Sequence, residues 1–193
     1  MPVTGNEGAP IADALAQTWI SNFIAAYPND TNSYLFGMNI INNVKNQTGY
    51  MGMRFYNALD TASAKTIIIY GVNSNGDGIT TYIADYGVPC PPTPNCTMAC
   101  TGNEGAQIAS ATAVTWINSF KTTYPNEIWA HLYGKNILAN VFNQSGCVGI
   151  RVHNALDQGV KKIIVYGVNS AGVKLTTYIA EYSVPCPTMC GKP

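Results

Sequence analysis

The stretch TGNEGA at residues 4–9 recurs letter for letter at residues 101–106, and this repetition decides the fold expected for the chain. Three further stretches return in the same order: NALD at 57–60 and 154–157, YGVNS at 70–74 and 166–170, and VPC at 88–90 and 184–186. One residue is lost from a loop between the first and second of these. About 50 of roughly 86 paired positions are identical, which identifies an internal repeat.

The repeat divides the chain into three parts. These are a first module at residues 1–90, a linker at 91–100 and a second module at 101–193. The linker, PPTPNCTMAC, is rich in proline and is predicted to be stiff and extended. Each module is long enough for a small core of its own. Because each copy holds a complete set of predicted elements, we expect two separate modules rather than one intertwined domain.

The first half of each module has the spacing of helices. From Ile11 to Phe23, apolar residues recur every four positions, and the YPN sequence at 27–29 ends the run. A second helix is predicted from about residue 34 to residue 46, with apolar side chains on one face.

The second half has the spacing of strands. Residues 51–56 alternate between apolar and other side chains, and residues 65–72 are apolar on both faces. Residues 79–86 are predicted to form a third strand, with a short helix as the alternative. Each module is therefore predicted to be α+β, with two helices packed on one face of a three-stranded antiparallel sheet in the order α-α-β-β-β.

Charge is scarce in this chain. Asp, Glu, Lys and Arg make up 10% of the residues, against roughly 25% in an ordinary soluble domain. Ten basic and ten acidic residues cancel, so nucleic acid is not an expected partner. No apolar run is long enough for membrane insertion, and the first residues lack a signal-peptide pattern. A nearly uncharged surface favours association, so we expect an extracellular or cell-surface protein rather than a cytoplasmic one.

The strand at 65–72 is apolar on both faces, so something must cover the sheet face that the helices leave open. That face is rich in tyrosine, which provides contact area at low entropic cost. It is covered either by the other module, by another chain or by a ligand. The candidate interface or ligand residues are Arg54, Tyr56, Tyr70, Tyr82, Arg151, Tyr166 and Tyr178.

Charged residues that both copies keep are candidates for a shared site or for a shared structural role. The matched pairs are Glu7 with Glu104, Arg54 with Arg151, Asp60 with Asp157, Lys65 with Lys161, Asp30 with Glu127, and Asp85 with Glu181. A glutamate and an arginine in both copies could polarise a carbonyl. The alternative is a structural loop clamp beside a helix start, and we assign Glu7, Glu104, Asp60 and Asp157 to such structural roles.

No catalytic residue, cofactor or metal ion is predicted. The histidines are not shared, because His131 matches Tyr34 and His153 matches Tyr56. A Cys147–His153 pair could form a nucleophile and base, but the first copy has Tyr50 in place of the cysteine. We therefore expect a buried thiol beside a tolerated surface histidine.

The cysteines predict local disulfides at the module ends. The candidates are Cys90, Cys96, Cys100, Cys186 and Cys190. Free thiols and a zinc site are the alternatives, although the tight cysteine pairs of common zinc sites are missing. Cys147 is the cysteine expected to remain free.

Together these patterns predict a non-enzymatic structural or interaction protein that self-associates as a homo-oligomer or polymer, such as an extracellular assembly or filament subunit. The alternative is a binding module for a small molecule, glycan or protein ligand. Such a module would use the exposed Tyr/Thr-rich sheet face of each repeat.

Overall fold

The computed structural model describes residues 2–90 and 98–186, and within them the two repeats contain the same series of elements. The first repeat contains β1 (Ala9–Pro10), α1 (Asp13–Ala26), β2 (Ser33–Gly37), α2 (Met38–Lys45), β3 (Gly52–Leu59), β4 (Lys65–Val72), β5 (Gly78–Asp85) and β6 (Val88–Cys90). The second contains β7 (Ala106–Gln107), α3 (Ser110–Thr123), β8 (Ala130–Gly134), α4 (Lys135–Phe142), β9 (Gly149–Asp157), β10 (Val160–Val168), β11 (Lys174–Glu181) and β12 (Val184–Cys186).

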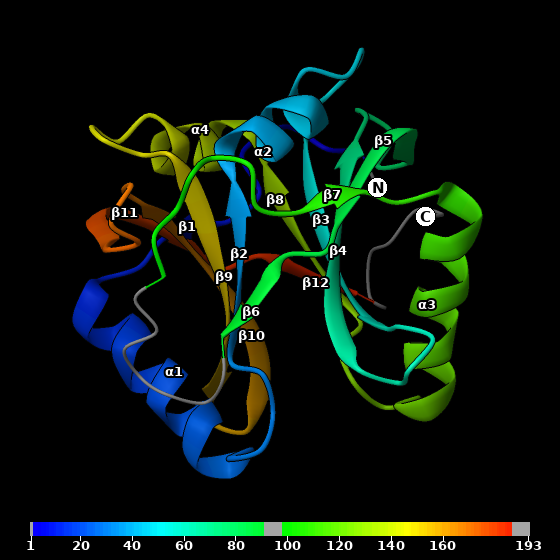
Figure 1. Cartoon of the computed structure of the whole chain (residues 1–193), viewed down its shortest axis with the longest axis horizontal. Helices are drawn as coiled ribbons and strands as arrows, with labels where there is room; N and C mark the ends of the chain where they lie inside the picture. The colour runs from blue at the N-terminus through cyan, green and yellow to red at the C-terminus, as the bar shows by residue number, and fades with distance from the viewer. Residues whose placement is uncertain (1, 91–97, 187–193) are drawn as a thin grey trace.

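The strands of the two repeats are interleaved in two six-stranded antiparallel sheets (Figure 1). One sheet has the order β1-β11-β10-β9-β2-β6, and the other has the order β12-β8-β3-β4-β5-β7. Each sheet therefore takes a three-stranded meander from one repeat and three flanking strands from the other. The predicted α+β class is confirmed. The prediction of a separate three-stranded sheet within each module is wrong, because each sheet has six strands drawn from both repeats.

Two inter-repeat ladders make this exchange. Strand β2 pairs with β9 from Ser33 opposite His153 to Gly37 opposite Gly149. Strand β8 pairs with β3 in the equivalent register. Helix α2 separates β2 from β3 along the chain, and β2 pairs with the meander of the other copy.

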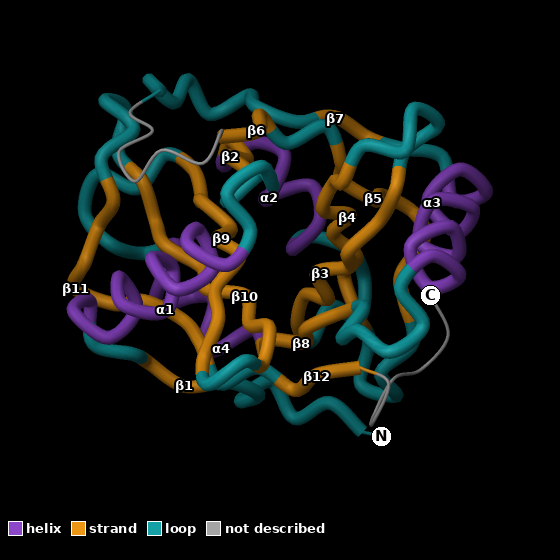
Figure 2. The backbone as a smooth tube through the Cα atoms, turned by 90° about the horizontal axis from the view of Figure 1, so that it is seen from below, coloured by secondary structure: helices purple, strands orange, loops and turns teal. Residues whose placement is uncertain are grey.

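The two sheets lie face to face between two outer helices. Ile67 and Ile69 of one sheet and Ile163 and Val165 of the other belong to one central core. Helix α1 covers the outer face of the first sheet, and α3 covers the outer face of the second (Figures 1 and 2). The prediction that both helices of a module share one sheet face is wrong, because α2 and α4 lie at one end of the sandwich.

This layering explains why the central strands are apolar on both sides. In β4, Ile67 and Ile69 face the opposite sheet, whereas Ile68 and Tyr70 pack beneath α3. Full burial of such side chains contributes roughly 1.5–3 kcal/mol each. Both faces of each sheet are thus covered within the chain.

Of three local predictions, two need correction and one is confirmed. The predicted helix at 34–46 begins as strand β2 and becomes helical only at Met38. Its apolar start, Leu35 and Phe36, fits a buried strand as well as a helix. Helix α1 begins at Asp13, because Pro10 pairs with Ala180 as part of β1. The third strand is confirmed as β5, so the short-helix alternative is wrong.

The TGNEGA stretch forms a loop that clamps the other repeat. The Gly37 N–H donates to the Glu104 carbonyl at 2.8 Å, and the Asn39 N–H donates to the Gly102 carbonyl at 2.9 Å. These carbonyls satisfy the first N–H groups of α2, which has no side-chain cap. A Cβ atom at Gly37 would overlap the backbone of Gly102. The same contacts join the first loop to Gly134 and Asn136.

Cutting the chain in two tests the interleaved topology. A chain of residues 1–90 lacks β9 and β8, which pair with β2 and β3, so we expect it to fold only by pairing with a second copy of itself. Its circular dichroism and its mass by analytical ultracentrifugation should then depend on protein concentration. A monomer that unfolds cooperatively, independent of concentration, would contradict the topology.

Candidate functional site

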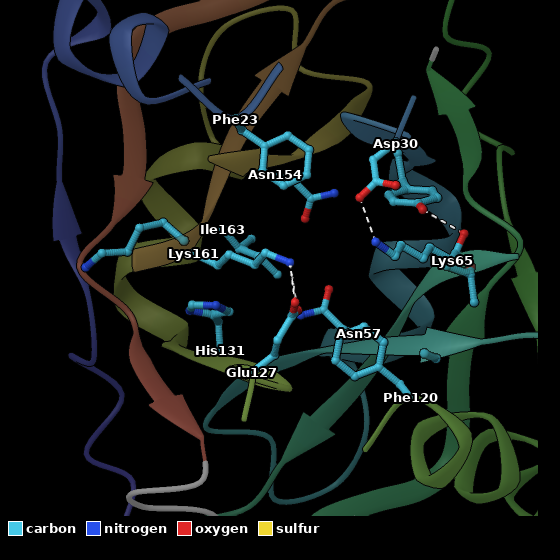
Figure 3. A pocket seen from close by; sticks show the side chains of 14 residues that line it. Phe23, Asp30, Asn57, Lys65, Phe120, Glu127, His131, Asn154, Lys161 and Ile163 are labelled. Carbon is cyan, nitrogen blue, oxygen red and sulfur yellow. Dashed lines mark hydrogen bonds and ion pairs between the residues drawn. The ribbon is translucent and has the colours of Figure 1, made fainter. Parts of the chain in front are cut away.

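A small polar cavity between the sheets is lined by residues that match across the repeats (Figure 3). Lys65 Nζ lies 2.6 Å from Asp30 Oδ2, and Lys161 Nζ lies 2.7 Å from Glu127 Oε2. Both pairs are among the charged residues that the sequence comparison singled out. Two of the six matched charged pairs, the two lysines and their carboxylate partners, therefore converge on one place.

The two lysines of this cavity link the two repeats. The Lys65 ammonium lies 5.1 Å from the ring centre of Tyr124, and the Lys161 ammonium lies 4.5 Å from that of Tyr27. Each lysine thus pairs within its own repeat and contacts an aromatic ring of the other. The cavity volume is about 30 Å³, which is room for one or two water molecules. It is too small for an organic substrate.

The histidines lie in different environments, and both are buried, so the surface position predicted for His153 is wrong. His131 lines the cavity, with Nδ1 2.7 Å from Ser183 Oγ; burial lowers its pKa to about 3. His153 packs edge-on against Tyr166, and burial lowers its pKa well below the ordinary value. Both imidazoles are therefore neutral at physiological pH.

Cys147 does not have the environment of a nucleophile. Its Sγ donates to the Gly149 carbonyl at 3.3 Å. Burial raises the pKa of the Cys147 thiol, whereas a catalytic cysteine requires a lowered pKa.

The sheet face predicted as a contact surface is buried. Arg54, Tyr56 and Tyr70 are fully buried on the face that α3 covers, and Arg151 and Tyr166 are buried on the face that α1 covers. The helices exclude solvent from them.

Hydrogen bonds hold these buried polar groups in place. Arg54 donates from Nη1 to Tyr56 Oη at 3.1 Å and from Nη2 to the Gly76 carbonyl at 2.9 Å. Tyr166 Oη donates to Asp13 Oδ1 at 2.8 Å. These contacts attach strands to a turn and to α1.

Tyr82 and Tyr178 occupy bulges in β5 and β11 and are half-buried against the central core. The Tyr82 N–H donates to Gln47 Oε1 at 2.8 Å, and the Tyr178 N–H donates to Gln144 Oε1 at 3.0 Å. A glutamine thus replaces the missing strand partner in each half.

The shared carboxylates shape loops. Glu104 accepts the Thr101 N–H at 2.6 Å and the Gly102 N–H at 3.1 Å, and Glu7 makes the same contacts in its own copy of the loop. Burial opposes the charge of Glu104, but the hydrogen bonds outweigh it and hold its pKa at about 2. Asp60 Oδ1 accepts two backbone N–H groups of the β3–β4 loop at 2.8 Å. Asp157 pairs with Val160 across the matching turn.

A larger groove, which the sequence did not predict, lies between α3 and the β3–β4 loop. Its volume is about 680 Å³. We call it the α3 groove, and its lining residues are Leu59, Asp60, Thr61, Ser63, Thr115, Trp116, Asn118, Ser119, Thr122 and Thr123. Hydroxyl and amide groups dominate this lining, with one carboxylate and one indole.

The matching position beside α1 is bridged by a side chain. Asn22, the counterpart of Ser119, reaches across and donates from Nδ2 to the Leu156 carbonyl at 3.3 Å. The turn there is also tighter, because Asp157 and Val160 pair directly around Gln158 and Gly159. Substitutions near the α3 groove thus distinguish the two halves. Residues that the two copies share cannot reveal a site that only one copy has.

The cysteines divide into two groups. Cys90 and Cys186 each take part in a disulfide, whereas Cys100 and Cys147 are free thiols. The prediction that Cys147 stays free is confirmed, and the assignment of Cys100 to a disulfide is wrong. Cys100 donates instead to Glu104 Oε2 at 3.1 Å as part of the second loop clamp. Cys96 and Cys190 lie outside the described residues.

Comparison of the chain with protein-family models, characterised proteins and solved structures finds no match. In residues 2–90 and 98–186, no group of three or more His, Cys, Asp or Glu side chains is placed to hold a metal ion. Nor does this part of the chain contain a helix long and apolar enough to cross a membrane.

The thiol assignment can be tested by alkylation without reductant. In the folded protein, iodoacetamide should label Cys147 before Cys100, because Cys100 is more deeply buried and its pKa is raised to about 11. After unfolding, both should be labelled, and peptide mass spectrometry should find Cys90 and Cys186 protected. Labelling of either protected cysteine before reduction would contradict the assignment.

A buried carboxyl should make stability depend on pH. Asp85 is fully buried and accepts a hydrogen bond from Thr66 Oγ1 at 2.6 Å. Burial raises its pKa to about 6 from the ordinary aspartate value of 3.8. The folded state then binds the proton more tightly than the unfolded state, so the free energy of unfolding falls as pH rises from about 4 to about 6.

Asp85→Asn removes this cost and keeps an acceptor for Thr66. We expect the variant to be more stable than the wild type by roughly 2–3 kcal/mol at pH 7.5 and by well under about 1 kcal/mol at pH 4. Glu181→Gln should show a smaller dependence, because Lys162 lies 3.8 Å from the carboxylate. Urea unfolding at both pH values measures this. An equal effect at the two pH values would show that ionisation is not the cause.

Proposed function

We propose that the chain is a non-enzymatic binding module that holds a neutral, polar ligand in the α3 groove. The observation that carries the proposal is the difference between two otherwise matched halves. One half has an open groove, and Asn22 bridges the equivalent position in the other half.

The composition of α3 supports this assignment. Thr122 and Thr123 replace Ala25 and Ala26 of α1. These substitutions add hydroxyl groups at the groove without adding charge. Ligand sites combine a concave surface with a few polar groups that fix orientation, and a net charge of zero gives no preference for a strongly charged partner.

Self-association through open sheet faces stays a prediction. Both faces of each sheet are covered, and the outermost strands β1, β6, β7 and β12 have only two or three residues each. Three of them contain proline, at Pro10, Pro89 and Pro185. Short, proline-containing edge strands disfavour pairing with another chain. The α3 groove therefore offers a stronger basis for a function than the sheets do.

The groove can be closed by copying the other half. Ser119→Asn places the side chain of Asn22 at the matched position, where it can reach the Leu59 carbonyl as Asn22 reaches that of Leu156. We expect it to weaken binding of neutral polar probes at least about tenfold, a loss of about 1.4 kcal/mol of binding free energy. Amide chemical shifts, measured with neutral sugars, polyols and short uncharged peptides, would detect the binding.

The matched control is Asn22→Ser, which changes the closed half and should leave binding unaltered. Shifts that map to the α3 groove and vanish in Ser119→Asn alone would support the proposal. If no probe perturbs the groove, or if Ser119→Asn binds as the wild type does, the proposal is wrong.

A further inference from the structure

Resting on the proposed function, we infer that the α3 groove binds a saccharide chain and that Tyr86 is an aromatic platform beside it. Trp116 lines the groove, and the Tyr86 ring packs against Trp116 with ring centres 6.0 Å apart. Tyr86 therefore adjoins the groove. It is 55% exposed, one of the largest apolar exposures among the described residues.

The backbone at Tyr86 adopts an energetically costly conformation. Its φ is 55°, in the left-handed region that a residue with a Cβ atom adopts only at an energetic penalty. Tyr182, its counterpart, has a φ of 54°. Glycine would relieve the strain at both positions, yet both keep tyrosine. Because Tyr182 shares this conformation, the strain belongs to both copies of the turn, and the α3 groove is what distinguishes Tyr86 from its counterpart.

The hydroxyl groups of α3 are oriented to receive donors. Thr115, Ser119 and Thr123 each donate to the backbone carbonyl four residues earlier. Their donor hydrogens are thus occupied within the helix, and the hydroxyl oxygens retain lone pairs for a ligand. With Asp60, which is acceptor-only when ionised, they form a surface that takes hydrogen-bond donors. A sugar presents many hydroxyl donors on a small neutral frame.

An aromatic ring beside these acceptors matches the other feature of a sugar. A pyranose ring has a face of C–H groups that packs on an aromatic side chain, while its hydroxyls point outwards to polar groups. A short uncharged peptide offers fewer donors for the same length. The combination of acceptors, one carboxylate and an exposed tyrosine therefore favours a neutral oligosaccharide over a peptide.

The second tyrosine provides an internal control. Tyr182 is 49% exposed and packs on Trp19 with ring centres 6.1 Å apart. Asn22 bridges the adjacent position there by donating to the Leu156 carbonyl. A sugar that needs both the platform and the groove should therefore use Tyr86 and not Tyr182.

The test uses the full chain on an array of neutral oligosaccharides, followed by calorimetry with the strongest binder. Tyr86→Gly removes the ring and relieves the left-handed strain, so the variant should fold. Circular dichroism and the thermal midpoint check this. We expect affinity to fall about tenfold in Tyr86→Gly, to be retained in Tyr86→Phe and to be unchanged in Tyr182→Gly.

The outcomes separate this inference from the proposed function. Peptide or polyol probes that bind the groove and are blocked by Ser119→Asn, without any bound oligosaccharide, would overturn the saccharide assignment and leave the binding module standing. An oligosaccharide whose affinity is the same in Ser119→Asn and in the wild type would overturn both. Equal losses in Tyr86→Gly and Tyr182→Gly would overturn the role of Tyr86.

Discussion

The ladders between β2 and β9 and between β8 and β3 are the constraint on which the rest of the structure depends. Backbone groups buried inside a sandwich must be paired, and here one neighbour of β9 and one neighbour of β3 belong to the other repeat. The face-to-face core, the position of α1 and α3 and the polar cavity all follow from this exchange. Neither repeat can complete its sheet without the other.

The two copies of the TGNEGA loop reinforce that exchange at the ends of α2 and α4. The N–H groups that begin α2 find acceptors on the loop of the second repeat, and those of α4 find acceptors on the loop of the first. The loop must approach closely, so Gly37 and Gly134 have no room for a side chain. The loop carboxylates Glu7 and Glu104 act on the loop itself. The TGNEGA sequence is therefore explained by assembly of the fold.

Local elements could be predicted from the sequence because their periodicity is local. The three strands of each meander and the first helix are found near the predicted positions. Strand exchange could not be predicted, since two copies with the same apolar pattern offer β3 equally good partners in either repeat. Leu35 and Phe36 suit a buried strand as well as a helix, so strand β2 could not be distinguished from the start of a helix. The shared lysines Lys65 and Lys161 do meet Asp30 and Glu127 in one cavity. The α3 groove, however, depends on Ser119 and a longer loop, which the copies do not share.

Covalent linkage of two interleaved copies has a consequence for how such a molecule can change. In a symmetric homodimer encoded by one sequence, every substitution appears twice, so opening one concave surface opens its mate. Here Ser119 and Asn22 are encoded separately while the shared framework stays intact. Joining the copies end to end thus allows the surface beside α3 to change while the matching surface beside α1 and the shared framework stay as they are.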